Sequence, residues 1–289
     1  MQVSSNKIKD IRRYYKRQLA GLYEENEIDS FFYILFEEYA GLSKAQILLN
    51  AETTISESEL LKIHFAVKAL MNHKPIQYII GSSEFYGLKF KVSPDVLIPR
   101  PETEELTELV IKENSGKKDL SIMDIGTGSG CIAITLKKYL PDAKVHALDV
   151  STNTLSLAKE NAKLNGQEIE FLKMDFLKYS NWDKLNAYDI IVSNPPYVRK
   201  SEMKGMNKNV LDYEPAIALF VEDEKPLLFY GAIAKFANGH LNKSGAVYCE
   251  INQYLGEETL SLFVKSGFEQ AEVFKDINGN DRILKVKLK

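Results

Sequence analysis

Hydrophobic residues recur at helical spacing along the first 75 residues, between many charged side chains. One stripe begins near residue 8, and residues 28–39 form a second helical stretch. Ser43 can cap a short helix that ends near Leu49, and Ser56 with Glu59 makes a capping box in front of a further apolar stripe. The pattern predicts a bundle of four or five helices without a strand. The first stripe consists of Ile8, Ile11, Tyr15, Leu19 and Leu22.

Residues 75–100 follow a different pattern. Short alternations of apolar and polar residues lie at 77–80 and 84–92 around glycines, and they predict a β-hairpin that links two domains. The segment 97–104, Leu-Ile-Pro-Arg-Pro-Glu-Thr-Glu, then opens a helix, because Pro101 suits a first helical turn and the glutamates complement the helix dipole. For Arg100 two interpretations stay open: it pairs with a carboxylate for structural reasons, or it guards a site.

From residue 120 onward, expected strands and helices alternate. This alternation predicts an α/β domain built on a parallel, doubly wound sheet. The expected strands are 120–124, 144–149, 169–174, 188–193 and 245–251, with a closing pair at 268–274 and 283–288; the expected helices are 131–139, 152–164, 226–241 and 256–264. The predicted organisation is a helical domain at 1–75, a hairpin linker at 76–100 and an α/β domain at 101–289.

Composition narrows the class of protein. The chain has 289 residues, of which 45% are hydrophobic, enough for one large core or two domains. The formal net charge of −3 argues against a protein that binds polyanions over its whole surface. A local basic face remains possible near the start of the chain, where it is either a solvated helix face or a contact for an anionic partner. Its members are Lys7, Lys9, Arg12, Arg13, Lys16 and Arg17.

Cysteine usage and hydropathy indicate the compartment. Cys131 and Cys249 lie in apolar settings far apart in the sequence, so buried free thiols are expected rather than a disulfide or a metal site. The start of the chain lacks the apolar core of a signal peptide, and no apolar run approaches ~18 residues. We therefore expect a soluble cytoplasmic protein that has no membrane partner and holds no metal.

A glycine-rich turn follows the first strand of the α/β domain. Three glycines alternate in it, and glycine there permits positive φ and close approach of a ligand to the backbone. The phosphate-binding signature G-x-x-x-x-G-K-[ST] is absent, and the dinucleotide signature G-x-G-x-x-G is missed because Cys131 occupies its last position. The expected cofactor-binding residues of this turn are Gly126, Thr127, Gly128, Ser129 and Gly130.

Two further strand ends complete the expected cofactor site. Asp149 ends the second strand, where a carboxylate can bind a ribose diol, and Asp175 with Phe176 follows the third, where a ring and an acceptor can close over a base. Helix capping is the alternative for Asp149, and core packing is the alternative for Phe176. A tight glycine turn without a phosphate cradle fits a nucleoside that carries an amino acid, namely S-adenosylmethionine.

The segment 194–197, Asn-Pro-Pro-Tyr, follows the buried strand 188–193. Each proline biases its predecessor toward extended geometry, so the backbone is stiff. The Asn194 side chain and the Pro195 carbonyl offer two acceptors, Pro196 cannot donate a hydrogen bond, and Tyr197 offers a flat ring. These groups suit a planar NH2 group, either an amide or the exocyclic amine of a base. A simple turn is the alternative.

Together these segments resemble the protein-(glutamine-N5) methyltransferases that modify peptide chain release factors. The resemblance rests on segments 97–104, 124–130 and 194–197 with Asp149, and it extends to 75–81, 213–215 and the closing Asp276, Gly279 and Arg282. It covers nearly the whole chain. One departure is visible at 220–225, Phe-Val-Glu-Asp-Glu-Lys, where the family usually has a glycine-rich turn.

The resemblance implies a Rossmann-like class I methyltransferase sheet of seven strands, one of them antiparallel, behind a helical domain that helps to grip the release factor. It implies that the 126–130 turn lines the methionine part of S-adenosylmethionine, Asp149 the ribose and Phe176 the adenine. Asn194, Pro195, Pro196 and Tyr197 would hold the glutamine amide of a Gly-Gly-Gln loop, with Asn194 and Tyr197 as catalytic residues and Asn194 also near the cofactor.

Rival functions stay open on the residues alone. An adenine-N6 nucleic-acid methyltransferase would use the same acceptors and ring, but the net charge and the lack of a DNA-recognition module disfavour it. A glutamine in another protein, such as a ribosomal protein, is a second alternative, and an idle cofactor-binding protein a third. We expect no sequence-specific nucleic-acid binding. The sequence does not establish the oligomeric state; a monomer is the expectation.

Overall fold

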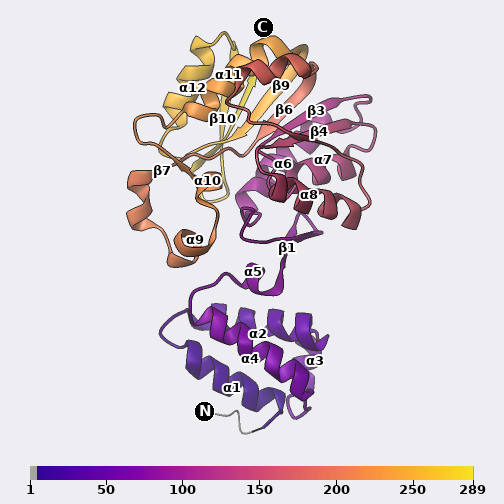
Figure 1. Cartoon of the computed structure of the whole chain (residues 1–289), viewed down its shortest axis with the longest axis vertical. Coiled ribbons are helices and arrows are strands. Elements are labelled where there is room, and N and C mark those ends of the chain that lie inside the picture. Colours follow the sequence, from indigo (N-terminus) through magenta and orange to yellow (C-terminus); the bar gives the residue numbers. More distant parts are fainter. Residues whose placement is uncertain (1–4, 289) are drawn as a thin grey trace. The chain divides into compact units, whose positions relative to one another are not determined.

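The computed structural model describes residues 5–288, which form two compact units (Figure 1). One unit contains the described residues up to Gly81 together with Asn207–Tyr213. The other contains Ser82–Met206 and the described residues from Glu214 onward. Within the first unit, the Tyr213 hydroxyl donates a hydrogen bond to the Asn72 carbonyl at 2.7 Å, which ties the later segment to the helices.

The first unit is helical, as its apolar stripes predict. Ser43 and Ser56 each form a capping box, with Gln46 and Glu59 respectively, so the two predicted helix starts are confirmed. The helices are α1 Ile8–Leu19, α2 Glu25–Ala40, α3 Lys44–Leu49, α4 Glu57–Leu70, α5 Ile76–Ile80 and α9 Lys208–Tyr213. The apolar faces of α1 to α5 make one buried cluster centred on α1, α2 and α4, whereas α9 contributes no buried residue.

The basic segment of α1 is extensively ion-paired inside this unit. Arg12 contacts Asp29 at 2.9 Å and Arg13 contacts Asp10 at 2.6 Å. Lys7 pairs with Glu52 at 3.1 Å; Lys9 also pairs with Glu52, and Lys16 with Glu25. This pairing fits the solvated helix face better than a surface reserved for an anionic partner.

Two local predictions in this part of the chain are wrong. Leu22 lies outside α1 and is 40% exposed, because Ala20 is extended and Gly21 has a φ of 82°. Residues 77–80 belong to the helix α5 and not to a strand. Gly81, at a φ of 75°, donates to the Gln77 carbonyl at 2.8 Å and closes that single turn. Four residues of alternation do not distinguish a strand from one helical turn.

The hairpin itself forms later, from β1 Ser82–Phe85 and β2 Leu88–Lys91. Its two turn residues, Tyr86 and Gly87, both have positive φ, 49° and 72°, as a tight hairpin turn requires. The Tyr86 amide donates to Glu104 Oε1 at 2.7 Å, which anchors the turn to the helix that begins at Pro101. The hairpin belongs to the second unit.

The second unit is built on a seven-stranded sheet with the order β10-β11-β9-β6-β3-β4-β5. Neighbouring strands are parallel except at β11, which pairs antiparallel with both β9 and β10. The sheet with one antiparallel strand is therefore confirmed. The strands are β3 Ser121–Ile125, β4 Lys144–Asp149, β5 Glu170–Lys173, β6 Tyr188–Ser193, β9 Leu241–Glu250, β10 Gln270–Lys275 and β11 Asp281–Lys287.

Helices cover both faces of this sheet (Figure 1). Alternate strand residues point to opposite faces: Ile122 packs with α6 and α7, and Met123 packs with α11. Each face therefore has its own buried cluster, which explains why the strands read as continuous apolar runs. The helices are α6 Pro101–Asn114, α7 Cys131–Tyr139 and α8 Thr152–Leu164 on one face, and α11 Leu228–His240 and α12 Gly256–Lys265 on the other.

The irregular stretch predicted between β6 and α11 contains short elements. Outside the first unit they are β7 Val198–Arg199, the 3-10 helix η2 Lys200–Gly205, α10 Ala216–Leu219 and β8 Phe220–Val221; a further 3-10 helix, η1 Tyr179–Lys184, follows β5. Within the segment that departs from the family pattern, Phe220 and Val221 pair in parallel with Val198 and Arg199. This part of the segment therefore forms a two-residue strand.

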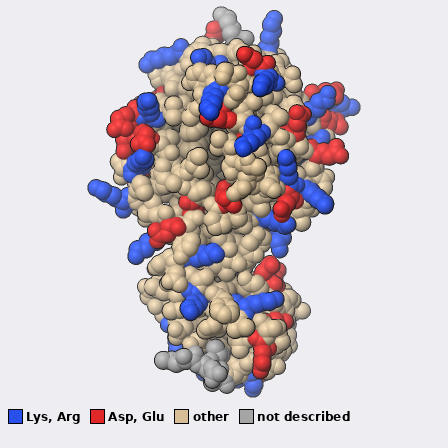
Figure 2. Space-filling view, in the orientation of Figure 1, with Lys and Arg blue, Asp and Glu red and all other residues tan. Residues whose placement is uncertain are grey.

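Both cysteines are buried free thiols, as expected. Burial raises the pKa of Cys131 to about 12, so its thiol stays protonated at neutral pH. Among residues 5–288, no helix is both long enough and apolar enough to cross a membrane. Figure 2 shows lysines and arginines interspersed with aspartates and glutamates over the face in view.

Candidate active site

A cavity of about 500 Å³ opens at the carboxyl ends of β3, β4 and β6. The strand order reverses between β3 and β6, since β4 lies on one side of β3 and β6 on the other. Such a switch point is where open α/β sheets bind their ligands. Most of the predicted site residues line this cavity: Gly126, Thr127, Gly128, Ser129, Asp149, Phe176, Asn194, Pro195 and Pro196.

The glycine turn after β3 adopts the conformation that its sequence predicts. Gly126, Gly128 and Gly130 have φ values of 74°, 55° and 83°. A Cβ at Gly126 or Gly128 would meet no atom within 4 Å, whereas a Cβ at Gly130 would lie 2.8 Å from Ile134 Cδ1 and 3.3 Å from Ala158 Cβ. The first two glycines therefore leave open space for a ligand, while Gly130 permits close packing of α7 against α8.

Asn161, on α8, holds the turn from behind. Its side chain is fully buried. The Nδ2 atom donates to the Ser129 carbonyl at 2.9 Å and to the Lys91 carbonyl at 3.0 Å, and Oδ1 accepts from the Lys91 amide at 2.7 Å. One asparagine thus connects the hairpin, α8 and the glycine turn. Sequence reasoning missed this residue, because an asparagine within an amphipathic helix gives no separate signal.

Asp124 lies buried beneath the same turn. Its Oδ2 accepts a hydrogen bond from Thr127 Oγ1 at 2.6 Å, and its Oδ1 has no hydrogen-bond partner among the described residues. Burial raises the pKa of Asp124 to about 7. An unpartnered buried oxygen is costly, although the Ala133 amide acts on this carboxyl and lowers its pKa. Asp124 is fully buried and is not among the residues that line the cavity. The segment 124–130 was recognised as a motif, but this aspartate was not predicted as a site residue.

Asp149 ends β4 and lines the cavity. Its Oδ2 accepts from the Gly128 amide at 3.1 Å and its Oδ1 accepts from the Ser151 amide at 3.0 Å. Burial raises the pKa of this carboxyl. The two bonds hold the carboxylate in place at the start of α8, and each oxygen retains a further acceptor site. The capping interpretation and the ligand interpretation are therefore compatible.

Phe176 both lines the cavity and packs in the core. It is 5% exposed, and its ring lies 5.2 Å from the Trp182 ring and 5.5 Å from the Phe236 ring, centroid to centroid. Asp175 Oδ1 accepts from the Leu177 amide at 3.1 Å, which shapes the turn after β5. These contacts leave only a small part of the Phe176 ring for a ligand.

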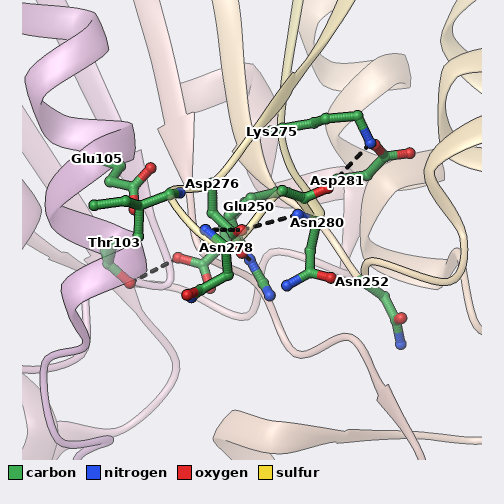
Figure 3. A network of polar contacts seen from close by, with 12 residues as sticks. Thr103, Glu105, Glu250, Asn252, Lys275, Asp276, Asn278, Asn280 and Asp281 are labelled. Atoms are coloured by element: carbon green, nitrogen blue, oxygen red, sulfur yellow. Dashed lines mark hydrogen bonds and ion pairs between the residues drawn. The ribbon is translucent and has the colours of Figure 1, made fainter.

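Asn194 is connected to α6 through Thr103. Asn194 Nδ2 donates to Thr103 Oγ1 at 3.0 Å. Thr103 Oγ1 in turn donates to Glu250 Oε2 at 2.6 Å, as Figure 3 shows. Because the Asn194 nitrogen is engaged with Thr103, its amide oxygen is the atom available to a ligand in the cavity. Thr103 and Glu250 are 2% exposed each.

Tyr197 differs from its predicted place. It is not among the residues that line the cavity, and its hydroxyl donates to Glu250 Oε1 at 2.8 Å. Burial, and then the charge of Glu250, raises the pKa of Tyr197 well above 10, so the hydroxyl keeps its proton. Burial also raises the pKa of Glu250, against the positive charge of Arg282. A stacking role for Tyr197 stays a prediction.

The closing turn 276–280 supports this network from the other side (Figure 3). Asp276 Oδ1 accepts from the Asn278 and Asn280 amides at 3.0 and 2.9 Å, and Asp276 Oδ2 accepts from Arg282 Nε at 3.1 Å. Sequence reasoning quoted Asp276 and Arg282 but missed Glu250. The sequence did contain an indication of Glu250, because a carboxylate within an apolar predicted strand needs a buried partner.

Arg100 pairs with Glu214, whose carboxylate is 1% exposed. Glu214 Oε2 also accepts from the Ile98 amide at 3.2 Å. Of the two interpretations of Arg100, the structure therefore shows the carboxylate partner, and it also places Arg100 in the wall of the cavity. The ion pair fixes the segment before α6 against the segment after residue 213.

Two family models match the chain. The first, described as the methyltransferase small domain, matches residues 101–212, and the second, described as the PrmC N-terminal domain, matches residues 10–81. Among solved structures, the Thermus thermophilus 16S rRNA N2 G1207 methyltransferase in complex with AdoMet and guanosine aligns with a TM-score of 0.53 at 18% identity, over 72% of this chain and 50% of that one. That likeness concerns the fold alone and confirms the methyltransferase sheet.

Curated relatives match over almost the entire length. The release factor glutamine methyltransferase of Flavobacterium psychrophilum is 48% identical over 98% of this chain and 99% of its own. The enzyme of the same name from Bacteroides thetaiotaomicron is 40% identical over 95% of this chain and 98% of its own. Given these identities, the geometry of the cavity and the two family models, the chain belongs to the release factor glutamine methyltransferase family.

Proposed function

We propose that this chain transfers a methyl group from S-adenosylmethionine to the side-chain amide nitrogen of the glutamine in the Gly-Gly-Gln loop of peptide chain release factors. The observation that carries the proposal is the placement of Asn194. Its amide nitrogen is held by Thr103, so its oxygen is left for a substrate N–H, beside the glycine turn of β3. Membership of the family supports a glutamine as the acceptor.

The residues of the cavity fit the proposed methyl donor. S-adenosylmethionine, when bound, supplies an electrophilic methyl group on a positively charged sulfur. Gly126, Thr127, Gly128 and Ser129 would line its methionine part, Asp149 its ribose and Phe176 its adenine. The open space at Gly126 and Gly128 supports this assignment. For Gly130 we propose a supporting role, because its missing side chain serves the packing of α7 on α8.

The proposed substrate site is formed by Asn194, Pro195 and Pro196 at the carboxyl end of β6. An amide nitrogen is a poor nucleophile, because its lone pair is delocalised into the carbonyl. If the Asn194 oxygen and the Pro195 carbonyl each accept one N–H of the glutamine, they favour the form with more electron density on nitrogen. They also fix the direction of attack.

Catalysis is then a matter of position and oriented dipoles. Preorganisation of this kind contributes ~7–11 kcal/mol in well-oriented systems. Asn194 is neutral and a poor base, and none is needed before attack, because the methylated amide cation loses its proton to water readily. Tyr197 acts in this scheme through its bond to Glu250, which holds the carboxyl end of the tetrapeptide in place.

The two-part organisation carries a further proposal. We assign docking of the release factor to the helical domain, predicted at 1–75 and extended by α5 to Gly81, and methyl transfer to the α/β domain, predicted at 101–289. The hairpin of the predicted 76–100 linker belongs to the second unit and not to a separate link. The match of residues 10–81 to the PrmC N-terminal domain supports a separate helical module. A protein that acts on release factors works where translation occurs, so we propose a cytoplasmic protein, monomeric, with release factors as its partners.

The test is a methylation reaction with purified components. The protein is incubated with S-adenosylmethionine and a release factor, and modified peptides are mapped by mass spectrometry. We expect one methyl group on the glutamine of the Gly-Gly-Gln loop. A release factor with that glutamine replaced by glutamate is the matched control, because it keeps the size and loses the amide nitrogen. A parallel reaction contains DNA and RNA; methyl found on nucleic acid alone would reject the proposal.

A further inference from the structure

One buried carboxylate is connected to both ends of the Asn194–Tyr197 segment. Glu250 ends β9, and each of its oxygens accepts a different hydroxyl: Tyr197 at 2.8 Å, and Thr103 at 2.6 Å. Thr103 in turn accepts from Asn194 Nδ2 at 3.0 Å. Glu250 and Thr103 are remote from each other in sequence. In the proposed mechanism neither of them contacts the glutamine amide of the substrate.

We propose that Thr103 and Glu250 are positioning residues that determine which atom of the Asn194 side chain faces the substrate. The inference rests on the proposed function, because it explains how Asn194 presents an acceptor. The amide nitrogen and oxygen of asparagine have nearly the same size and shape. Shape alone therefore does not exclude the flipped side chain, which would present two donors to the donors of the glutamine amide.

Burial raises the pKa of Glu250, while the hydrogen bonds from Thr103 and Tyr197 and the charge of Arg282 lower it. In its ionised form Glu250 can only accept from Thr103, and the direction of the hydrogen bonds then disfavours the flipped Asn194 side chain. A threonine hydroxyl has one proton, and Thr103 gives that proton to Glu250. Its remaining lone pairs can only accept, so the Asn194 atom at 3.0 Å must be the nitrogen. In the flipped form two oxygens would meet without a proton between them. Because Thr103 is buried and Asn194 is partly buried, that arrangement is disfavoured.

Removal of the hydroxyl is the first test. Thr103→Val keeps the shape of the side chain, and Thr103→Ser keeps the hydroxyl. We expect Thr103→Val to lower kcat by roughly 10-fold or more, with the Kd for S-adenosylmethionine unchanged within about twofold, and Thr103→Ser to retain most of the activity. A purely structural role would reduce cofactor binding and turnover together. Equal kcat for the valine and serine variants would overturn the proposal.

The second test reverses the direction of the two hydrogen bonds that link Asn194, Thr103 and Glu250. It does not depend on the folding of the valine variant. In the Asn194→Asp variant, a carboxylate oxygen faces the Thr103 oxygen. In the Asn194→Asp, Glu250→Gln double variant, the side-chain nitrogen of the introduced glutamine can donate to Thr103, which frees the threonine hydroxyl to donate to the introduced aspartate. We expect the double variant to be roughly 10-fold more active than Asn194→Asp alone. Activity no higher than the product of the two single effects contradicts the proposal.

These tests are distinguishable from failure of the proposed function. If the wild-type protein methylates no release factor, the methylation assay fails before any variant is compared. If the wild type is active and the hydroxyl is irrelevant, only the positioning role is lost.

Discussion

The replacement of Gly130 by alanine tests whether this glycine serves helix packing, while Gly128 serves cofactor binding. Gly130 has a φ of 83°, and a Cβ there would lie 2.8 Å from Ile134 Cδ1 and 3.3 Å from Ala158 Cβ. The left-handed backbone costs a non-glycine residue ~1–2 kcal/mol. The contact at 2.8 Å is with the end of the flexible Ile134 side chain, which can rotate away, so the overpacking cost of ~1–3 kcal/mol comes mainly from Ala158 on the buried face of α8. We expect Gly130→Ala to lower the free energy of unfolding by ~2–5 kcal/mol.

Gly128→Ala is the matched control for this substitution. Gly128 also has a positive φ, 55°, but its Cβ would meet no atom within 4 Å. Its expected stability loss is therefore the backbone cost alone, ~1–2 kcal/mol. Because Gly128 lines the cavity and Gly130 does not, Gly128→Ala should weaken S-adenosylmethionine binding more than Gly130→Ala does.

Denaturant unfolding and calorimetric titration of the cofactor measure the two effects separately. Both variants are titrated at a temperature where each is folded, so that the Kd reflects the folded protein. The reasoning would be refuted by equal losses of unfolding free energy in the two variants. It would also be refuted if the larger loss of cofactor affinity belonged to Gly130→Ala.

Two further predictions concern single side chains. Asn194→Ala should reduce kcat by at least ~100-fold while the far-ultraviolet circular dichroism spectrum and most of the affinity for S-adenosylmethionine are retained; near-normal turnover would eliminate Asn194 as the amide acceptor. Asp124→Asn should flatten the pH dependence of stability. Burial raises the pKa of Asp124 from 3.8 to about 7, so the folded state binds the proton more tightly and stability falls as pH rises between these values. At ~1.4 kcal/mol per pKa unit the buried charge costs up to ~4 kcal/mol above pH ~7, and the asparagine variant should be more stable than the wild type there. Unfolding by urea at about pH 5 and pH 8 measures this difference, and a wild-type protein that gains stability over that interval relative to the variant contradicts it.

Local sequence signals predicted much of the fold. The bounds of α7, β4 and α8 agree with the predicted 131–139, 144–149 and 152–164, because each element has a clear period and is bordered by glycine or a capping residue. The errors lie where these signals were short. Residues 77–80 form one helical turn, and Leu22 follows a glycine that ends its helix.

The candidate site was predictable only in part, for a different reason. Residues that lie on a turn after a strand, such as Gly126 and Asn194, reach the same sheet edge whenever the strands are parallel. The partners that orient them are fixed by tertiary contacts. Thr103 and Glu250 are 147 positions apart, and Arg100 and Glu214 are 114 positions apart. No local periodicity in the sequence indicates such a pair, so the hydrogen bonds that link Asn194, Thr103 and Glu250 are recognisable only in the three-dimensional structure.

The position of β11 has a consequence for the order in which the protein is completed during synthesis. This strand is inserted between β9 and β10, with Ile283 opposite Glu250, although it is made after both of them. A nascent chain that ends before β11 has β9 and β10 without the strand that joins them, and it lacks Arg282, whose charge acts on Glu250. The network behind the candidate site is therefore complete only after residues 281–287 have been synthesised, so a chain truncated before them carries the glycine turn and the tetrapeptide without Arg282 beside Glu250.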